Sequence, residues 1–284
     1  INYPVAPGGT IKYPAKKDLA SLLNSEMNSK NPILIGNLLT REDINVFVSA
    51  DNMVSRHVLV IGMTGSGKSV ATKRIARELM HKDYPIFIVD PHGDYLGMVK
   101  QAQKLFPKHK IKLFYPKISA PANNKEVIFA LIEKLGKNLT DPQYDFLNWL
   151  LDNIAYEAGQ NLTDYINILI QRANTAAANK RNKSSTGLSG VGNTGATTMG
   201  VVARSLRVVL SKLKKMEKDN RENMEKFPHL KFEELPDSYS QPENIIAKSQ
   251  VSILYLKGYE SLPSSTIVSI LLENLFNHRS AGNK

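Results

Sequence analysis

The stretch HVLVIGMTGSGKSVATKRIA, residues 57 to 76, decides the fold. The apolar β-formers of HVLVIG lead into a glycine-studded turn, and a lysine and a serine then open a pattern with helical spacing. A second apolar stretch, PIFIVD, ends at Asp90. A buried strand, a helix and a second buried strand within about 35 residues form a βαβ unit, so the sequence predicts two parallel strands joined by a helix.

The glycine turn predicts a phosphate site. Its sequence GMTGSGKS fits the pattern G-x-x-x-x-G-K-[ST] between a predicted strand and a predicted helix. Glycines let successive N–H groups curl around phosphate oxygens, and the helix N-terminus adds partial positive charge. We expect Lys68 to reach the β and γ phosphates and assist catalysis, and the Ser69 hydroxyl to hold Mg²⁺. The residues predicted to bind ATP are Gly62, Thr64, Gly65, Ser66, Gly67, Lys68, Ser69 and Val70.

Two interpretations of Asp90 stay open. It ends an apolar stretch, as does the catalytic aspartate that supports Mg²⁺ in nucleotide-binding cores. Alternatively, it ends the neighbouring strand, and the strand with that aspartate comes later in the chain. Asp90, His92 and Asp94 could also form a metal site, whereas a turn held by Asp90 and Gly93 would explain the same residues without a metal.

Composition restricts the classes of protein. The chain has 284 residues, enough for one large domain or two smaller ones, and 42% hydrophobic residues can build a sizeable core. No apolar run approaches the roughly 18 residues needed to cross a bilayer, so we expect no membrane partner. No signal peptide opens the chain. Cysteine is absent, which excludes disulfides and thiolate metal sites and agrees with a cytoplasmic location.

Positive charge is concentrated in one segment. The net charge is +11, and residues 172–226 hold twelve bases and four acids, a net +8. Such a concentration is typical of proteins that bind a phosphate backbone. Residues 174–198 are small, polar and glycine-rich, which predicts a mobile loop. We expect Lys180, Arg181 and Lys183 in this loop to contact DNA; a merely solvated charged loop is the alternative.

The order of patterns predicts one α/β domain interrupted by an insertion. A lead-in covers residues 1–32, and the first part of the nucleotide-binding core covers 33–118, with a third strand at 110–116. Residues 119–240 form a helical, basic insertion that ends with a long basic helix. The core returns at 241–284 with a buried strand, QVSILYLKG, and an amphipathic helix.

The sequence from GNLLTREDINVFVSADNMVSRH through TGSGKS to DPHGDY resembles the HerA-like ATPases of the HerA/FtsK superfamily. The resemblance is close over residues 33–98. It implies a RecA-like P-loop fold with a largely parallel sheet, a homo-hexameric ring, and ATP-driven movement of double-stranded DNA through the central pore. Archaeal members are similar to the motor of a DNA-end-resection machine in recombinational repair and pair with a NurA-family nuclease.

The chain departs from this family pattern in two ways. Family members carry a β-barrel domain before the ATPase. They also carry a later strand with the catalytic glutamate, followed by an arginine finger, whereas this sequence stops at Lys284. We therefore expect a fragment of a longer protein. Two other functions stay open: a related P-loop motor that drives protein or conjugative DNA secretion, indifferent to duplex DNA, and a metabolic kinase, for which no acceptor pocket is evident.

Overall fold

The computed structural model describes residues 8, 13–24, 31–118, 125–136, 138–157, 160–184, 188–236, 238 and 241–280. It divides into two compact units. Unit 1 comprises residues 1–86 and 95–110, and unit 2 comprises residues 87–94 and 111–284.

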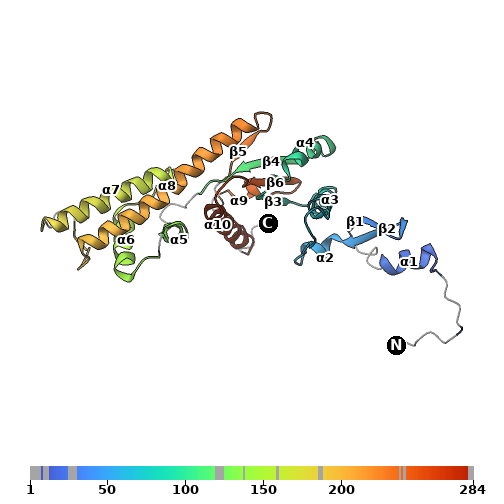
Figure 1. Cartoon of the computed structure of the whole chain (residues 1–284), viewed down its shortest axis with the longest axis horizontal. Coiled ribbons are helices and arrows are strands. Elements are labelled where there is room, and N and C mark those ends of the chain that lie inside the picture. Colours follow the sequence, from blue (N-terminus) through green and yellow to red (C-terminus); the bar gives the residue numbers. More distant parts are fainter. Residues whose placement is uncertain are drawn as a thin grey trace. The chain divides into compact units, whose positions relative to one another are not determined.

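Unit 1 holds a two-stranded hairpin and four helices among its described residues (Figure 1). Strands β1 and β2 pair antiparallel, as the two short strands predicted for residues 33–50 require. Ile33 and Ile44 are fully buried because alternate residues of the hairpin face its apolar side. The elements are α1 (Lys16–Leu23), β1 (Pro32–Leu38), β2 (Arg41–Ser49), α2 (Ala50–Val54), α3 (Lys68–Met80) and α4 (Leu96–Leu105).

The buried strand predicted for HVLVIG is wrong. Residues 57–63 form no helix or strand, and Val58, Leu59 and Ile61 are 53%, 80% and 81% exposed. An apolar run shows only that a segment suits burial, whereas a strand also needs a neighbour to exchange hydrogen bonds with it. In the part of the chain that the structure describes, no strand pairs with this segment, so the predicted parallel βαβ unit is absent.

The four-stranded sheet has the order β3-β6-β4-β5, formed by β3 (Ile86–Asp90), β4 (Lys110–Tyr115), β5 (Phe232–Glu234) and β6 (Gln250–Tyr255). Strand β4 pairs with β5 in parallel. Strand β6 is buried at all six positions, as expected for a strand with neighbours on both edges and cover on both faces. The predicted α/β class with a parallel sheet is confirmed, and so are the strands predicted at PIFIVD, 110–116 and QVSILYLKG.

The helices of unit 2 build the main core. They are α5 (Lys125–Leu135), α6 (Asp141–Asn153), α7 (Leu162–Arg181), α8 (Ala196–Lys226), α9 (Pro242–Ile245) and α10 (Ser261–Ser280). Helix α6 begins with a capping box in which Thr140 and Gln143 satisfy each other's backbone N–H groups. Helices α7 and α8 pack along each other (Figure 1). The apolar face of α8, with Leu206 and Val209 fully buried, joins the same cluster as Leu147 of α6.

The loop predicted for residues 174–198 is much shorter than expected. Helix α7 continues to Arg181, and α8 already begins at Ala196. The small residues Ala176, Ala177 and Ala178 suit a loop by size, yet alanine is the best helix former, and Ala176 and Ala177 are buried in the core. Lys180 and Arg181 therefore lie on a helix, so their predicted loop setting is wrong.

Several predictions fall outside the described residues. These are the irregular lead-in over residues 1–7 and 9–12, the end of the predicted first helix at Met27, and residues 185–187 of the predicted loop.

Candidate nucleotide-binding loop

Residues 62–69 form a compact loop that ends where α3 begins. Gly65 and Gly67 have φ angles of 84° and 90°, the left-handed region that glycine adopts without strain. The N–H of Ser66 donates to the carbonyl oxygen of Met63 at 3.1 Å, which closes the turn. Gly67 is the N-cap of α3 and has no side chain, so no N-cap side chain covers the first turn of the helix. This is the arrangement that backbone recognition of an anion requires.

The space around each glycine agrees with a phosphate cradle. A Cβ at Gly62 would lie 2.4 Å from the Ser66 hydroxyl oxygen, so the loop closes tightly there. A Cβ at Gly65 or Gly67 would meet nothing within 4 Å. Gly62 is thus tightly packed, whereas the absence of a side chain at Gly65 and Gly67 leaves room for a ligand. The residues present fit a bound phosphate chain.

Lys68 is held by its own loop. Its Nζ donates to the carbonyl oxygen of Met63 at 2.7 Å, while the Met63 carbonyl also accepts from Ser66. Thr64 is exposed and Ser69, in the first turn of α3, is partly buried. Val70, also in the first turn of α3, is 69% exposed. The structure therefore brings together all the residues predicted to bind ATP in one loop and the first turn of one helix.

Tyr95 joins α4 to the first turns of α3, a contact that the sequence did not predict. Its hydroxyl lies 2.8 Å from Thr72 Oγ1, and the Lys73 ammonium lies 5.5 Å from its ring centroid. The Thr72 hydroxyl also donates to the main chain, 3.2 Å from the Lys68 oxygen and 3.1 Å from the Ser69 oxygen. Tyr95 thus reaches, through one hydroxyl, the turn that carries Lys68 and Ser69.

Asp90 belongs to unit 2 and is 1% exposed at the end of β3. Its Oδ1 accepts hydrogen bonds from the N–H groups of Gly93, at 2.8 Å, and Asp94, at 3.0 Å. Gly93 has a φ of 76°, and a Cβ there would lie 3.0 Å from Lys257 and 3.2 Å from Tyr255. The carboxylate therefore holds the turn of residues 91–94. His92 and Asp94 are exposed, and among the described residues no group of three His, Asp or Glu side chains could hold a metal ion.

Comparison with known proteins gives the family. Residues 33–275 match the family described as "Helicase HerA, central domain". The chain belongs to this family. The match covers the glycine loop, the sheet and the α7–α8 hairpin together, so the predicted resemblance is confirmed.

Individual relatives match shorter stretches. The chain is 33% identical over 98 residues to a "Probable DNA double-strand break repair helicase HerA" of Methanocaldococcus jannaschii, covering 34% of this chain and 19% of that protein. It is 32% identical over 91 residues to the "DNA double-strand break repair helicase HerA" of Pyrococcus furiosus, covering 32% and 16%. It is 38% identical over 152 residues to "Probable helicase MJECL08" of M. jannaschii, covering 52% and 26%. The aligned stretches thus span 16–26% of these relatives' own lengths.

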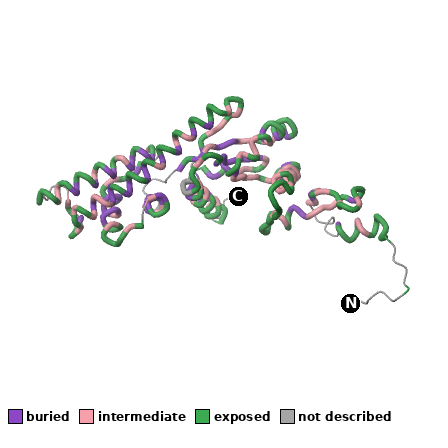
Figure 2. Tube along the Cα trace, viewed as in Figure 1, coloured by how far each residue is buried: buried purple, intermediate pink, exposed green. Residues whose placement is uncertain are grey.

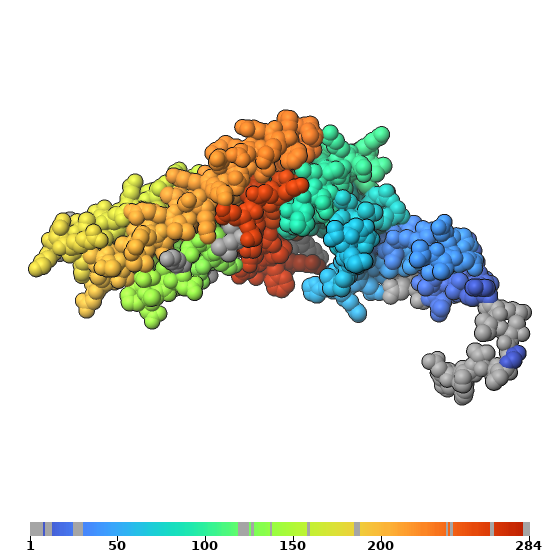
Figure 3. Space-filling view, viewed as in Figure 1, coloured from blue at the N-terminus to red at the C-terminus, as the bar shows by residue number. Residues whose placement is uncertain are grey.

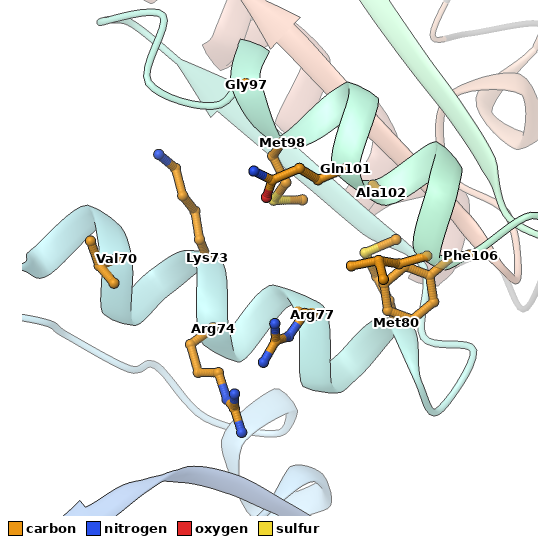
Figure 4. Close-up of a pocket in the computed structure, with 11 residues that line it drawn as sticks. Val70, Lys73, Arg74, Arg77, Met80, Gly97, Met98, Gln101, Ala102 and Phe106 are labelled. Atoms are coloured by element: carbon orange, nitrogen blue, oxygen red, sulfur yellow. The ribbon is translucent and has the colours of Figure 1, made fainter.

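A cavity of about 530 Å³ lies between α3 and α4 in unit 1 (Figure 4). Lys73, Arg74 and Arg77 of α3 form its basic side, and Met80 and Phe106 close its apolar end. Its lining includes no residue of the loop 62–69. Two of the bases are engaged elsewhere, because Arg74 bonds to Glu78 and to the Leu34 carbonyl, and Lys73 lies over Tyr95. The cavity and the glycine loop are therefore separate features of unit 1.

The three bases predicted to contact DNA lie together at the end of α7. Lys180 and Arg181 form its last turn, and Lys183 follows with a φ of 55°. Arg181 and Lys183 are exposed and Lys180 is partly so. None of the described helices is long and apolar enough to cross a membrane.

Proposed function

We propose that this chain is the ATP-binding core of a DNA translocase or helicase that acts on double-stranded DNA, in DNA-end resection during recombinational repair. The observation that carries the proposal is the glycine loop at the start of α3 in a chain of the HerA central-domain family. Two relatives named as double-strand break repair helicases support the repair context.

The loop residues have separate roles in this proposal. Gly65 and Gly67 carry no side chain, which leaves space for phosphate oxygens to approach the backbone, and Lys68 exchanges its bond to Met63 for the terminal phosphates. The Ser69 hydroxyl holds Mg²⁺, which supplies positive charge to the phosphate oxygens when it is bound. Asp90 is the carboxylate proposed to assist catalysis, and its buried position fixes its orientation.

The proposed partners follow from family and charge. The working assembly is a homo-hexamer that encloses duplex DNA and cooperates with a NurA-family nuclease. Residues 172–226, with their net charge of +8, form the DNA-facing part of the chain, and Lys180, Arg181 and Lys183 contact phosphates. These bases belong to a helical hairpin that is rooted in the core of unit 2.

ATP turnover with and without linear duplex DNA tests the proposal, on this chain and on Lys68→Ala, with the mass of the assembly measured by light scattering. We expect turnover that duplex DNA stimulates, that Lys68→Ala abolishes, and that accompanies a hexamer.

Turnover indifferent to duplex DNA would instead favour the secretion-type motor. ATP binding without turnover would place the catalytic carboxylate outside residues 1–284 and remove Asp90 from that role.

A further inference from the structure

The exposed face of α8 carries a line of bases. Arg204, Arg207, Lys214, Lys218 and Arg221 recur at steps of three, seven, four and three residues, with Ser211 filling the gap at the same spacing. All six residues are exposed. Steps of three and four place them within roughly a third of the helix circumference. We call these six positions the α8 stripe.

The stripe has a rigid support. The opposite face of α8 is buried, with Met199, Val202, Leu206 and Val209 at 0% exposure in the core of unit 2. Figure 2 shows buried and exposed positions alternating along this helix. Helix α8 also packs against α5, α6 and α7. The bases are therefore presented on a straight, packed helix rather than on a loop.

Two basic residues of the stripe have a side-chain partner in the described structure. Lys218 lies 3.6 Å from Glu222, and Arg207 donates to the Asn174 amide oxygen at 3.1 Å. Among the described residues, Arg204, Lys214 and Arg221 form no ion pair.

Acidic residues lie beside the C-terminal part of the stripe. Glu217, Glu222 and Glu225 stand three or four residues from Lys214, Lys218 or Arg221, a spacing at which opposite charges support the helix. The segment is still strongly basic, because residues 204–221 hold seven Lys and Arg residues and two acids, a net charge of +5. Such a surface attracts a polyanionic partner.

The stripe also contacts α7. Arg207 contacts Asn174, which lies about two turns before Lys180 and Arg181, and α7 and α8 run side by side (Figure 3). The stripe and the three bases at the end of α7 therefore belong to one helical hairpin of unit 2.

We infer that the α8 stripe binds the phosphate backbone of duplex DNA without reading its sequence. The inference rests on the proposed function and names the DNA-binding surface. Single-stranded DNA is usually held by aromatic side chains on which bases stack. Residues 196–226 contain no Phe, Trp or Tyr, and the stripe offers only Arg, Lys and Ser. Such a surface attracts phosphates but has no platform for unpaired bases, so duplex is the preferred substrate.

The length of the stripe determines how long a segment of duplex DNA it can contact. From Arg204 to Arg221 the helix rises about 26 Å at 1.5 Å per residue. One turn of duplex DNA is about 34–36 Å long, so the stripe covers most of one turn. Each phosphate contact contributes about −0.9 to the slope of log K against log salt concentration. Removing three basic side chains is therefore expected to reduce the magnitude of that slope by about three.

The test is the binding of this chain, without nucleotide, to a fluorescent 20-base-pair duplex and to a single strand of the same length over a range of KCl concentrations. The stripe variant is Arg204→Gln, Lys214→Gln and Arg221→Gln. The matched control removes three exposed bases of unit 1, Lys100→Gln, Lys104→Gln and Lys108→Gln. Circular dichroism and ATP binding confirm that each variant is folded. If the triple variant unfolds, the single variant Lys214→Glu replaces it.

We expect the stripe variant to bind the duplex at least tenfold more weakly, and the slope of log K against log salt concentration to become smaller by about three. The control variant should change neither quantity to that extent. Equal losses of duplex affinity in both variants would overturn the inference that the α8 stripe binds DNA, without contradicting the proposed function. A single strand bound as tightly as the duplex would overturn the duplex preference. No duplex binding by the unmodified chain would overturn both the stripe and the proposed function.

Discussion

The ammonium of Lys68 donates a hydrogen bond to the main-chain carbonyl oxygen of Met63, 2.7 Å away, across the loop that the two residues share. A ligand phosphate must compete with this carbonyl, and a charged oxygen is the stronger acceptor. We expect Lys68→Ala to weaken ATP binding by roughly 10- to 100-fold, since hydrogen bonds to charged groups contribute about 1.5–3 kcal/mol. Titration with a fluorescent ATP analogue measures this. Lys73→Ala, one turn along the same helix, is the control, and an equal loss there would show a general charge effect.

Gly62 is the crowded glycine of the loop. A Cβ there would overlap Ser66 Oγ at 2.4 Å, so Gly62→Ala should distort the loop at a cost of about 1–3 kcal/mol and weaken ATP binding. Adding Ser66→Ala removes that oxygen and leaves the nearest side-chain atom at 3.3 Å, which should restore part of the loss. Thermal melting with and without ATP compares the variants.

Gly97→Ala is the matched control for this substitution. A Cβ at Gly97, in α4, would meet nothing within 4 Å, so alanine should leave stability unchanged or raise it by up to about 1 kcal/mol. Failure of Ser66→Ala to rescue Gly62→Ala would show that the overlap is not the cause.

Asp90 can be tested for two separate roles. Asp90→Ala removes the acceptor of two N–H groups in a buried turn and should destabilise unit 2 by about 1–3 kcal/mol. Asp90→Asn keeps one oxygen to accept those bonds but removes the charge, so it should melt close to the unmodified chain while ATP turnover falls about 100-fold. Full turnover in Asp90→Asn would limit the residue to holding its turn.

Tyr95 and Thr72 should be coupled. A threonine hydroxyl has one proton, and Thr72 directs it to the main chain of α3, so the Tyr95 hydroxyl donates to Thr72 Oγ1. We expect a double-mutant cycle of Tyr95→Phe and Thr72→Val to give a coupling energy of about 1 kcal/mol in urea unfolding. Strictly additive effects would show that the 2.8 Å contact contributes nothing to stability.

The glycine loop and most strands could be predicted because each depends on residues close together in the sequence. A G-x-x-x-x-G-K-S turn needs only its own backbone, and PIFIVD and QVSILYLKG have the composition of strands buried on both faces. HVLVIG has the same composition but no strand pairs with it in the described structure, and composition cannot supply that partner.

The parts that could not be predicted depend on distant residues. The Trp149 indole N–H donates to the Ser189 carbonyl at 2.9 Å, which anchors part of a segment interpreted as a mobile loop. The contact between Tyr95 and Thr72 joins two helices, and nothing in either local pattern indicates it. The α8 stripe is visible in the sequence only after the buried face of the helix is known.

Tyr259 gives a prediction for alkaline pH. Burial raises the pKa of its hydroxyl from 10.0 to about 12, and the hydroxyl donates to Asn220. Because the folded pKa is above the ordinary value, this contribution to stability is complete below pH 10 and is lost as the pH rises toward 12.

At pH 8, Tyr259→Phe should be about 1 kcal/mol less stable than the unmodified chain, since it lacks the hydrogen bond. At pH 11 ionisation of Tyr259 should lower the free energy of unfolding of the unmodified chain by about 1.4 kcal/mol. Tyr259→Phe has no group to ionise there, so the difference in stability between the two chains should disappear. Urea unfolding at pH 8, 10 and 11 measures the difference, and a constant gap would show that Tyr259 ionises as readily in the folded chain as in the unfolded one.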